Sequence, residues 1–296
     1  MLPAAGSSRI FERNLLKQQP ICGKMRHMDV SCILCEEIDM ERYFSLSLEH
    51  LRIPCKIYEP DFGAPQRCIL GVHGFGAGKD TQILTALSEE MAIFGAATVC
   101  FDFPAHGDSP LQSDALTLQN CVETLLHTAQ WTHNRYPDVD FCVFASGFGA
   151  YVTLIALEQL ESRVGKVKLV LHTPNLRMSE TLLGMVRMSE QQLKAAGSVV
   201  LNAERSFSVS YDFFEQLRAN TALVSYDSPM LVLHGELDEI LPIDDMLSFR
   251  RINEACRLVV IPGADHQFRT PGAWDMVVDL TRDWFEFEQV LLCDWR

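Results

Sequence analysis

The chain has 296 residues, of which 48% are hydrophobic and 22% charged, the composition of a water-soluble globular protein rather than a disordered one. Its formal net charge of −14 at pH 7 argues against a basic groove for nucleic acid and against an anionic membrane surface as partner. No stretch of about 18 apolar residues predicts a transmembrane helix, and the opening residues lack the apolar core of a secretory signal peptide. We interpret residues 1–28 as a tail with no assigned role, ahead of a domain at 29–296.

Ten cysteines are present, and their positions favour a reducing compartment. Cys68, Cys100 and Cys142 lie inside apolar strand-like runs, where cysteine behaves as a small hydrophobic residue. Cys32 and Cys35 form a C-x-x-C pair, but no second pair or histidine pair follows to complete a zinc site. The sequence therefore predicts a cytoplasmic protein without a bound metal.

From about residue 40, β-rich apolar runs alternate with amphipathic helical stretches, the pattern of a mostly parallel sheet covered by helices on both faces. The first two strands are separated by a short polar stretch, which predicts an antiparallel start. Gly95 and Pro137 then mark the ends of two helices. In chain order, the sequence predicts strands at 43–48, 53–58 and 68–72, a helix at 81–94, a strand at 97–101, a helix at 118–136 and a strand at 141–144.

The alternation breaks in the second half of the chain. After a helix at 150–160 and a strand at 167–171, residues 175–226 contain helical patterns at 180–196 and 211–219, with no strand-like run between them that would extend the sheet. Regular alternation resumes with a strand at 230–233, a helix at 244–252, a strand at 258–261 and a closing helix at 274–292. We expect residues 175–226 to form a small helical cap over the carboxyl edge of the sheet, where this class of fold places its ligand site.

Two motifs follow consecutive parallel strands. His73-Gly74-Phe75 comes after the third predicted strand, and a segment running from Asp102 through His106 to Ser109 comes after the fourth. Together with two later loops, they resemble α/β hydrolases over roughly residues 40–290, and within that superfamily the small bacterial carboxylesterases that include cinnamoyl and feruloyl esterases. The resemblance implies an α/β fold with a short helical insertion and acyl-serine chemistry that needs no cofactor.

The two later loops supply an acid and a base in the order that this resemblance implies. Asp238 lies just past the carboxyl end of the penultimate strand, and His266 lies in the loop after the last strand. Asp238 would hold the imidazole of His266 in the tautomer that accepts a proton. The competing interpretation is that Asp238 only caps the next helix and His266 is an ordinary polar loop residue.

The turn that should carry the nucleophile reads Ala145-Ser146-Gly147-Phe148-Gly149. Strand and helix meet there at an angle that accepts only small residues two positions before and two positions after the nucleophile. If Ser146 were the nucleophile, those positions would hold Phe144 and Phe148, whose rings would collide with neighbouring elements. Gly147 satisfies the spacing, and glycine adopts the strained backbone of this position without penalty. We therefore place Gly147 where a serine is expected, with Ser146 as the fallback nucleophile.

The remaining candidates are the groups that would stabilise an oxyanion. The backbone N–H groups of Phe75 and Phe148 occupy the two loop positions that usually do so. The glycines near Phe75 are not followed by a phosphate-binding lysine-serine pair and do not form a G-x-G-x-x-G opening, so nucleotide binding is not expected. No cofactor is predicted.

Three explanations of Gly147 remain open at the level of sequence. The chain can be an esterase silenced by an engineered serine-to-glycine substitution, a natural non-catalytic relative that binds a small ligand, or an enzyme that uses Ser146, for example a transacylase or thioesterase. The leading prediction is a serine-type carboxylic-ester hydrolase scaffold for small acyl or aromatic esters that is inactivated by glycine at the nucleophile position. Its expected partner is a small-molecule ester.

Overall fold

The computed structural model describes residues 41–48 and 50–287. Within these residues, eight strands form one sheet in the order β1-β2-β4-β3-β5-β6-β9-β10. β1 and β2 pair antiparallel with each other, and β2 is antiparallel to β4. The remaining neighbours, β4-β3-β5-β6-β9-β10, are mutually parallel. The strands are β1 (Glu41–Leu48), β2 (Leu51–Tyr58), β3 (Arg67–Val72), β4 (Ala96–Phe101), β5 (Asp140–Ser146), β6 (Lys168–His172), β9 (Met230–Gly235) and β10 (Cys256–Ile261). The predicted α/β class with an antiparallel start and a mostly parallel sheet is confirmed.

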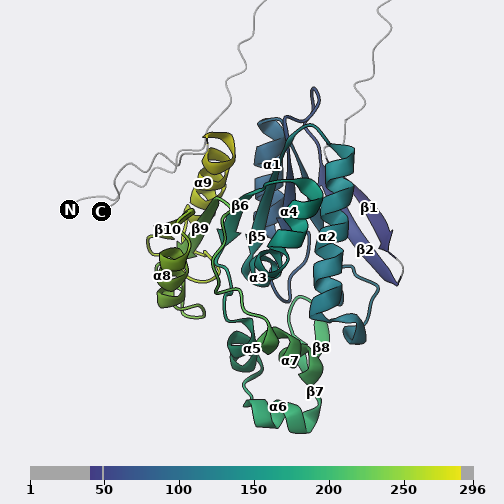
Figure 1. Ribbon diagram of the computed structural model, residues 1–296, viewed down its shortest axis with the longest axis vertical. Helices are drawn as coiled ribbons and strands as arrows, with labels where there is room; N and C mark the ends of the chain where they lie inside the picture. Colours follow the sequence, from purple (N-terminus) through teal and green to yellow (C-terminus); the bar gives the residue numbers. More distant parts are fainter. Residues whose placement is uncertain (1–40, 49, 288–296) are drawn as a thin grey trace, which may run out of the picture. The chain divides into compact units, whose positions relative to one another are not determined.

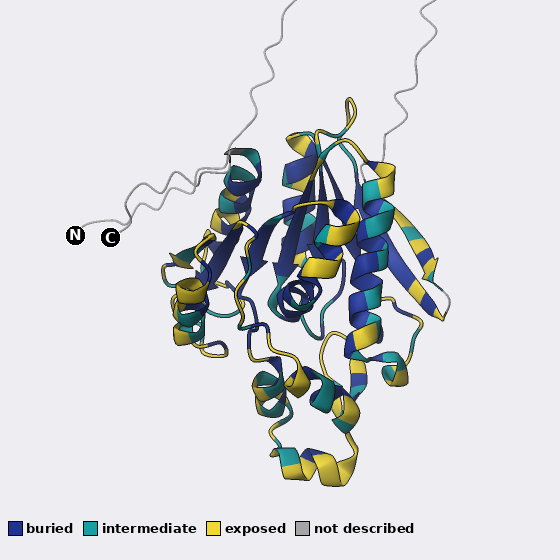
Figure 2. Ribbon diagram, in the orientation of Figure 1, coloured by how far each residue is buried: buried dark blue, intermediate teal, exposed yellow. Residues whose placement is uncertain are grey.

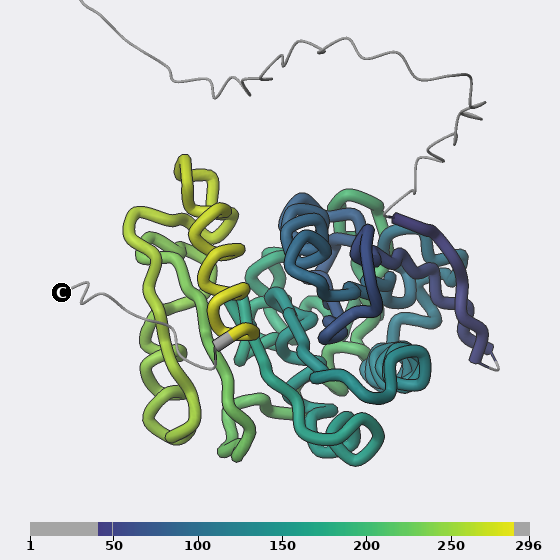
Figure 3. The backbone as a smooth tube through the Cα atoms, turned by 90° about the horizontal axis from the view of Figure 1, so that it is seen from above, coloured from purple at the N-terminus to yellow at the C-terminus, as the bar shows by residue number. Residues whose placement is uncertain are grey.

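Helices cover both faces of the sheet (Figure 1). Those outside the segment between β6 and β9 are α1 (Gln82–Ile93), α2 (Leu118–Arg135), α3 (Gly147–Ile155), α4 (Leu157–Val164), α8 (Ile243–Ile252) and α9 (Ala273–Phe287), with a single 3₁₀ turn, η1 (Ser113–Ala115). Seen from above, α1 and α9 lie on one side of the sheet and α2 on the other (Figure 3). Of the predicted closing helix at 274–292, the last five residues lie outside the described part of the chain.

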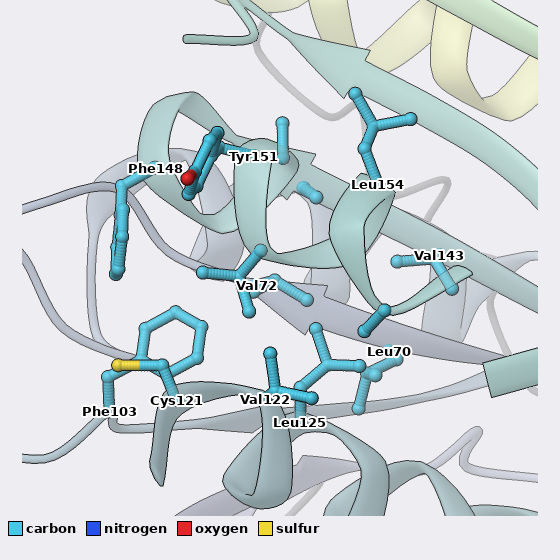
Figure 4. Packing of buried hydrophobic residues seen from close by; sticks show 14 of the residues in the cluster. Leu70, Val72, Phe103, Cys121, Val122, Leu125, Val143, Phe148, Tyr151 and Leu154 are labelled. Atoms are coloured by element: carbon cyan, nitrogen blue, oxygen red, sulfur yellow. The ribbon is translucent and has the colours of Figure 1, made fainter. Parts of the chain in front are cut away.

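Two hydrophobic cores result from the alternation of side chains along the central strands. In β3, Leu70 and Val72 face the core beneath α2 and α3, whereas Ile69 faces the core beneath α1 and α9. The first of these cores brings side chains of β3, α2 and α3 together, including Val122 and Phe148 (Figure 4). The central strands are buried along nearly their whole length (Figure 2). Burial on both faces is why they read as continuous apolar runs.

The ends of two predicted helices agree with local capping chemistry. The hydroxyl of Thr117 accepts a hydrogen bond from the Asn120 backbone N–H, 3.0 Å away, and starts α2. α1 ends at Ile93, and Gly95 follows with a φ of +75°, a left-handed conformation that favours glycine.

Two other predicted helices are wrong in that each is broken into two. The predicted helix at 150–160 is α3 followed by α4, which are separated by Ala156 at φ −90° and ψ 0°. The predicted helix at 180–196 ends at Val186, because Arg187 adopts a left-handed conformation with φ +53°. A new helix then starts at a capping box formed by Ser189 and Gln192. The amphipathic period continues across both breaks, so periodicity alone does not reveal them.

The segment between β6 and β9 adds no strand to the main sheet, as expected, but it is not purely helical. It contains α5 (Met178–Val186), α6 (Glu190–Ala196), β7 (Ser198–Asn202), β8 (Ser206–Ser210) and α7 (Tyr211–Ala219). β7 and β8 pair antiparallel in a two-stranded sheet of their own. The insertion is thus helical except for this hairpin, which the sequence pattern does not predict, because its two strands show only short two-residue alternations between stronger helical patterns. In Figure 1 the segment lies at one end of the main sheet.

Candidate active site

Gly147 stands at the sharp turn from β5 into α3, with a φ of +49°. A side chain other than hydrogen is strained in this left-handed region, yet a Cβ placed there would find no atom nearer than Gly74 Cα at 3.9 Å. Gly149 is different, because its Cβ would lie 2.4 Å from the carbonyl oxygen of His73. The turn thus has space for a side chain at 147 and none at 149.

Ser146 is the last residue of β5 and has ordinary extended backbone angles, φ −105° and ψ 138°. Its hydroxyl lies 3.2 Å from Nδ1 of His172, which is the residue directly opposite it on β6. Ser146 therefore does not share the apex of the turn with Gly147, and its recorded side-chain partner is not His266.

His172 is a site residue that no motif in the sequence indicates; its only sequence signal is its position at the carboxyl end of a parallel strand, β6. The ring is 4% exposed and packs against Phe268 and Trp274, with centroid distances of 4.5 and 5.8 Å. Burial, and then the neighbouring His266, lower the pKa of His172 to about 3. It is consequently neutral at pH 7 and a weak base.

Asp238 and His266 meet at the same edge of the sheet. Nδ1 of His266 lies 2.8 Å from Oδ2 of Asp238, which fixes Nδ1 as the protonated nitrogen if the carboxylate is ionised. The other carboxylate oxygen accepts hydrogen bonds from the backbone N–H groups of Ile240 and Leu241, at 2.9 and 2.8 Å. The contact expected from the chain order of the two loops is present.

The side chain of Asp238 is completely buried, whereas that of His266 is 28% exposed. Burial by itself raises the pKa of Asp238, but the hydrogen bonds from His266 and from the Leu241 and Ile240 amides outweigh it and leave the pKa below its usual value. The carboxylate is therefore charged at neutral pH. α8 begins at Ile243 with Pro242 at its N-cap, so Asp238 is not the cap residue of that helix.

A cavity of about 430 Å³ brings the predicted residues together. Ser146 and Gly147 line it from the turn after β5, and His266 lines it from the loop after β10. α5 contributes Thr181 and Met185 to the same cavity, which places this part of the insertion over the carboxyl edge of the sheet. Asp238 does not line the cavity and reaches it only through His266.

Phe75, from the loop after β3, and Phe148, the residue after Gly147, both line the cavity. Their rings contact each other at a centroid distance of 5.1 Å, and Phe75 also contacts Phe207 and Phe213 of the insertion at 5.4 and 6.1 Å. Neither the Phe75 nor the Phe148 backbone N–H donates a hydrogen bond to another described residue. Both amides are thus available to an acceptor brought by a ligand.

Buried polar groups fix the loop that holds Phe75. His73 is 1% exposed, accepts a hydrogen bond from the Phe103 backbone N–H through Nε2 (3.1 Å), and donates one to Gly74 O through Nδ1 (2.7 Å). Lys79, further along the loop, forms ion pairs with Asp102 at 3.1 Å and with Asp108 at 2.5 Å. These contacts tie the loop after β3 to the loop after β4.

Trp274, at the start of α9, also lines the cavity, and no sequence motif indicates it. Its proximity to His172 depends on the packing of α9 against the sheet, for which no local signal exists.

Among the described residues, no cluster of three or more His, Cys, Asp or Glu side chains has the geometry to hold a metal ion. None of the described helices has both the length and the apolar character needed to cross a membrane. The C-x-x-C pair at Cys32 and Cys35 lies outside the described residues.

No protein-family model and no curated protein sequence matches the chain. The fold, in contrast, matches many solved structures. Est1E from Butyrivibrio proteoclasticus, with ferulic acid bound, has a TM-score of 0.70 and 17% identity, over 82% of this chain and 97% of its own. The mouse alpha/beta hydrolase domain-containing protein 10 has a TM-score of 0.67 and 16% identity, over 84% and 100%.

An esterase from Pyrococcus furiosus is similar as well, with a TM-score of 0.62 and 15% identity over 83% of this chain and 90% of its own. These structures share the parallel sheet, the flanking helices and nearly the full length of the described domain. The chain therefore has the α/β-hydrolase fold.

Proposed function

We propose that this chain is a serine-type carboxylic-ester hydrolase scaffold for small acyl or aromatic esters, in which Gly147 takes the place of the nucleophilic serine. The observation that carries the proposal is the Asp238–His266 hydrogen bond of 2.8 Å beside a glycine with φ +49°. A buried carboxylate that orients a partly exposed histidine is the arrangement that activates a nucleophile in this class of enzyme. A serine side chain at 147 would project from the turn into the same cavity.

The backbone amides of Phe75 and Phe148 are the proposed oxyanion donors. They are free of other described acceptors. Phe75 lies in the loop after β3 and Phe148 directly follows Gly147 at the start of α3, so a carbonyl oxygen held by both would present its carbon at the apex. The aromatic rings around the cavity favour an acyl group that is itself apolar or aromatic. Est1E, whose structure holds ferulic acid, supports an aromatic ester as the substrate class.

Ser146 is not favoured as the nucleophile. Its recorded partner is His172, whose pKa of about 3 makes it a poor general base. No carboxylate orients the His172 ring, because Nε2 of that ring has no hydrogen-bond partner among the described residues. A transacylase or thioesterase based on Ser146 would therefore lack an activating base.

The decisive experiment compares the chain with its Gly147→Ser variant on short p-nitrophenyl esters. We expect the variant to raise kcat by about 10³-fold or more, with a smaller change in KM, because a nucleophile acts in the transition state rather than in docking. The double variant Ser146→Ala/Gly147→Ser should keep this gain.

Two outcomes would refute the proposal. A Gly147→Ser variant that folds and does not gain activity would favour the natural ligand-binding protein instead. Ordinary enzyme rates in the unmodified chain that disappear on Ser146→Ala would make Ser146 the nucleophile.

We also propose that the protein works in the cytoplasm on a small-molecule ester, without nucleic-acid or membrane partners and without a cofactor. Six cysteines of the described residues are buried free thiols, which suits a reducing compartment. The net charge of −14 supports a neutral ligand rather than a polyanion.

A further inference from the structure

We propose that the chain, with glycine at position 147, hydrolyses activated esters by direct attack of a water molecule that His266 deprotonates, without an acyl-enzyme intermediate. The inference rests on the proposed function, since it uses the same cavity and the same oxyanion donors. It goes beyond that function in assigning an activity to the chain as it stands. With glycine at position 147, a water molecule takes the place of the serine hydroxyl as the nucleophile.

The first argument is space at the apex of the turn. A Cβ at Gly147 would meet no atom closer than 3.9 Å, so the volume that a serine CH₂–OH group would fill opens directly into the cavity that Gly147 lines. A water molecule takes up about 30 Å³, which is comparable to the two heavy atoms of that group. Alanine would leave a methyl group in this space, and glycine leaves none.

The second argument is a base that is already oriented. Asp238 holds Nδ1 of His266 at 2.8 Å and is itself held by two backbone amides, so the imidazole is fixed in one orientation and one tautomer. Nε2 of His266 makes no hydrogen bond with another described residue, and His266 lines the cavity together with Gly147. Nε2 can therefore take a proton from water beside the turn.

The reaction balances with water as the only co-reactant. Nε2 of His266 takes a proton from water while the oxygen bonds to the ester carbonyl carbon, and the carbonyl electron pair moves to the oxygen held by the Phe75 and Phe148 amides. The oxyanion then collapses, the bond to the leaving oxygen breaks, and that oxygen takes the proton back from Nε2. One ester and one water give one carboxylic acid and one alcohol or phenol.

This route selects a class of substrate. Departure of the leaving group competes with loss of water from the same tetrahedral intermediate. Aryl esters are favoured over alkyl esters, because the phenol that they release has a pKa of about 10, as in tyrosine, and its phenolate therefore leaves readily. The aromatic side chains of Phe75 and Trp274 in the cavity wall also suit an aryl group. We assign the activity to aryl esters of small acids.

The test places three residues at position 147 and uses p-nitrophenyl and phenyl acetate. With glycine at position 147, turnover should be faster for p-nitrophenyl acetate, which has the better leaving group, than for phenyl acetate, and it should be slower in deuterium oxide. Turnover should fall by about 100-fold in Gly147→Ala and in His266→Ala, which is the usual contribution of a positioned general base. Ser146→Ala should retain turnover that depends on His266. Urea unfolding of each variant checks that the fold is preserved. If His266→Ala perturbs the fold, Gly147→Ala still tests the inference, because it leaves the Asp238–His266 hydrogen bond intact.

Intact-mass spectrometry of quenched reactions gives an independent readout. The Gly147→Ser variant should show an acetyl adduct, and the glycine chain should show none. Equal rates in the glycine chain, Gly147→Ala and His266→Ala, or an acetyl adduct on Ser146 or His266 of the glycine chain, would overturn the inference. If Gly147→Ser restores esterase activity while the glycine chain stays at the background rate, the inference fails and the proposed function stands. If Gly147→Ser gives no gain, the proposed function fails.

Discussion

Two glycines in the turn between β5 and α3 have different physical roles. Gly147 has a left-handed φ of +49° and open space at its Cβ position, so a side chain there costs backbone strain but no collision. Gly149 is confined by packing, because its Cβ would lie 2.4 Å from His73 O and 2.9 Å from Val72 O. The lack of space at Gly149 is the constraint that determines which residue of the turn can lie at its apex.

Substituting Gly149→Ala should destabilise the fold by about 3 kcal/mol, because the added methyl group meets backbone atoms that cannot move aside. Gly184→Ala is the matched control, since Gly184 lies in α5 with no atom within 4 Å of its Cβ position. That change should stabilise the protein by about 0.5–1 kcal/mol through helix propensity. Urea unfolding of both variants checks the prediction, and equal effects would contradict it.

Buried histidines make stability depend on pH. Burial lowers the pKa of His73 to about 4 and those of His106 and His172 to about 3. In the unfolded chain these groups titrate near pH 6.5, so the unfolded state binds more protons than the folded state below that pH. Stability should therefore fall as pH drops from about 6.5 toward 4.5, with each histidine contributing up to about 1.4 kcal/mol per pH unit.

Urea unfolding between pH 7 and 4.5 measures this slope, and a His106→Phe variant tests its origin. The His106 ring lies among Phe75, Phe148 and Phe207, an environment that accepts another aromatic ring. The variant should lose one histidine's share of the slope, up to about 1.4 kcal/mol per pH unit. An unchanged slope would assign the pH dependence to other groups.

At the scale of elements, the site depends on two loops that are joined by a buried ion cluster. Lys79, in the loop after β3, is 2% exposed and contacts carboxylates of Asp80, Asp102 and Asp108. Burial by itself lowers the pKa of Lys79, but the surrounding carboxylates raise it overall. The amine is therefore charged, and it holds the loop that contains Phe75 against the loop that follows β4.

Replacing Lys79→Met should cost about 3–5 kcal/mol of stability, because it leaves the carboxylate of Asp102 buried without its counter-charge. Lys166→Met is the control, since the Lys166 side chain is 73% exposed in its pair with Glu161 and solvent-exposed ion pairs contribute little to stability. Chemical denaturation of both variants decides the matter. A loss at Lys79 no larger than that at Lys166 would mean that the cluster does not stabilise the loops.

At the scale of the whole molecule, burial of the thiols predicts the chemical reactivity of the protein. Of ten cysteines in the chain, six are buried free thiols of the described residues. Burial raises the pKa of five of them to about 12 and that of Cys121 further still. A protonated, inaccessible thiol does not react.

The native, reduced protein should therefore react with a thiol reagent such as dithionitrobenzoate at no more than four positions, since ten less six leaves four. In denaturant, all ten thiols should react. Fast modification of more than four thiols under native conditions would show that the described core opens readily.

The regular parts of the fold could be predicted because they depend on local and periodic patterns. Strands buried on both faces must be continuously apolar, and helices between them must be amphipathic, so the βαβ order is visible in the sequence. The loops that hold Asp238 and His266 could also be placed, because the resemblance to α/β hydrolases puts the acid and the histidine after the last two parallel strands, whose carboxyl ends lie at one edge of the sheet. The steric rule at the turn led to Gly147 rather than Ser146.

The remaining features depended on contacts between residues that are distant in sequence. The break at Arg187 and the hairpin of β7 and β8 arise where packing of the insertion overrides local propensity. The bond from Ser146 to His172, the approach of Trp274 and the Lys79 cluster each join separate elements. The sequence by itself determined the order of the strands of the main sheet and of the helices between them, because these follow from local periodicity. Only the tertiary structure decided which side chains meet, because that depends on how β5, β6 and α9 pack together in three dimensions.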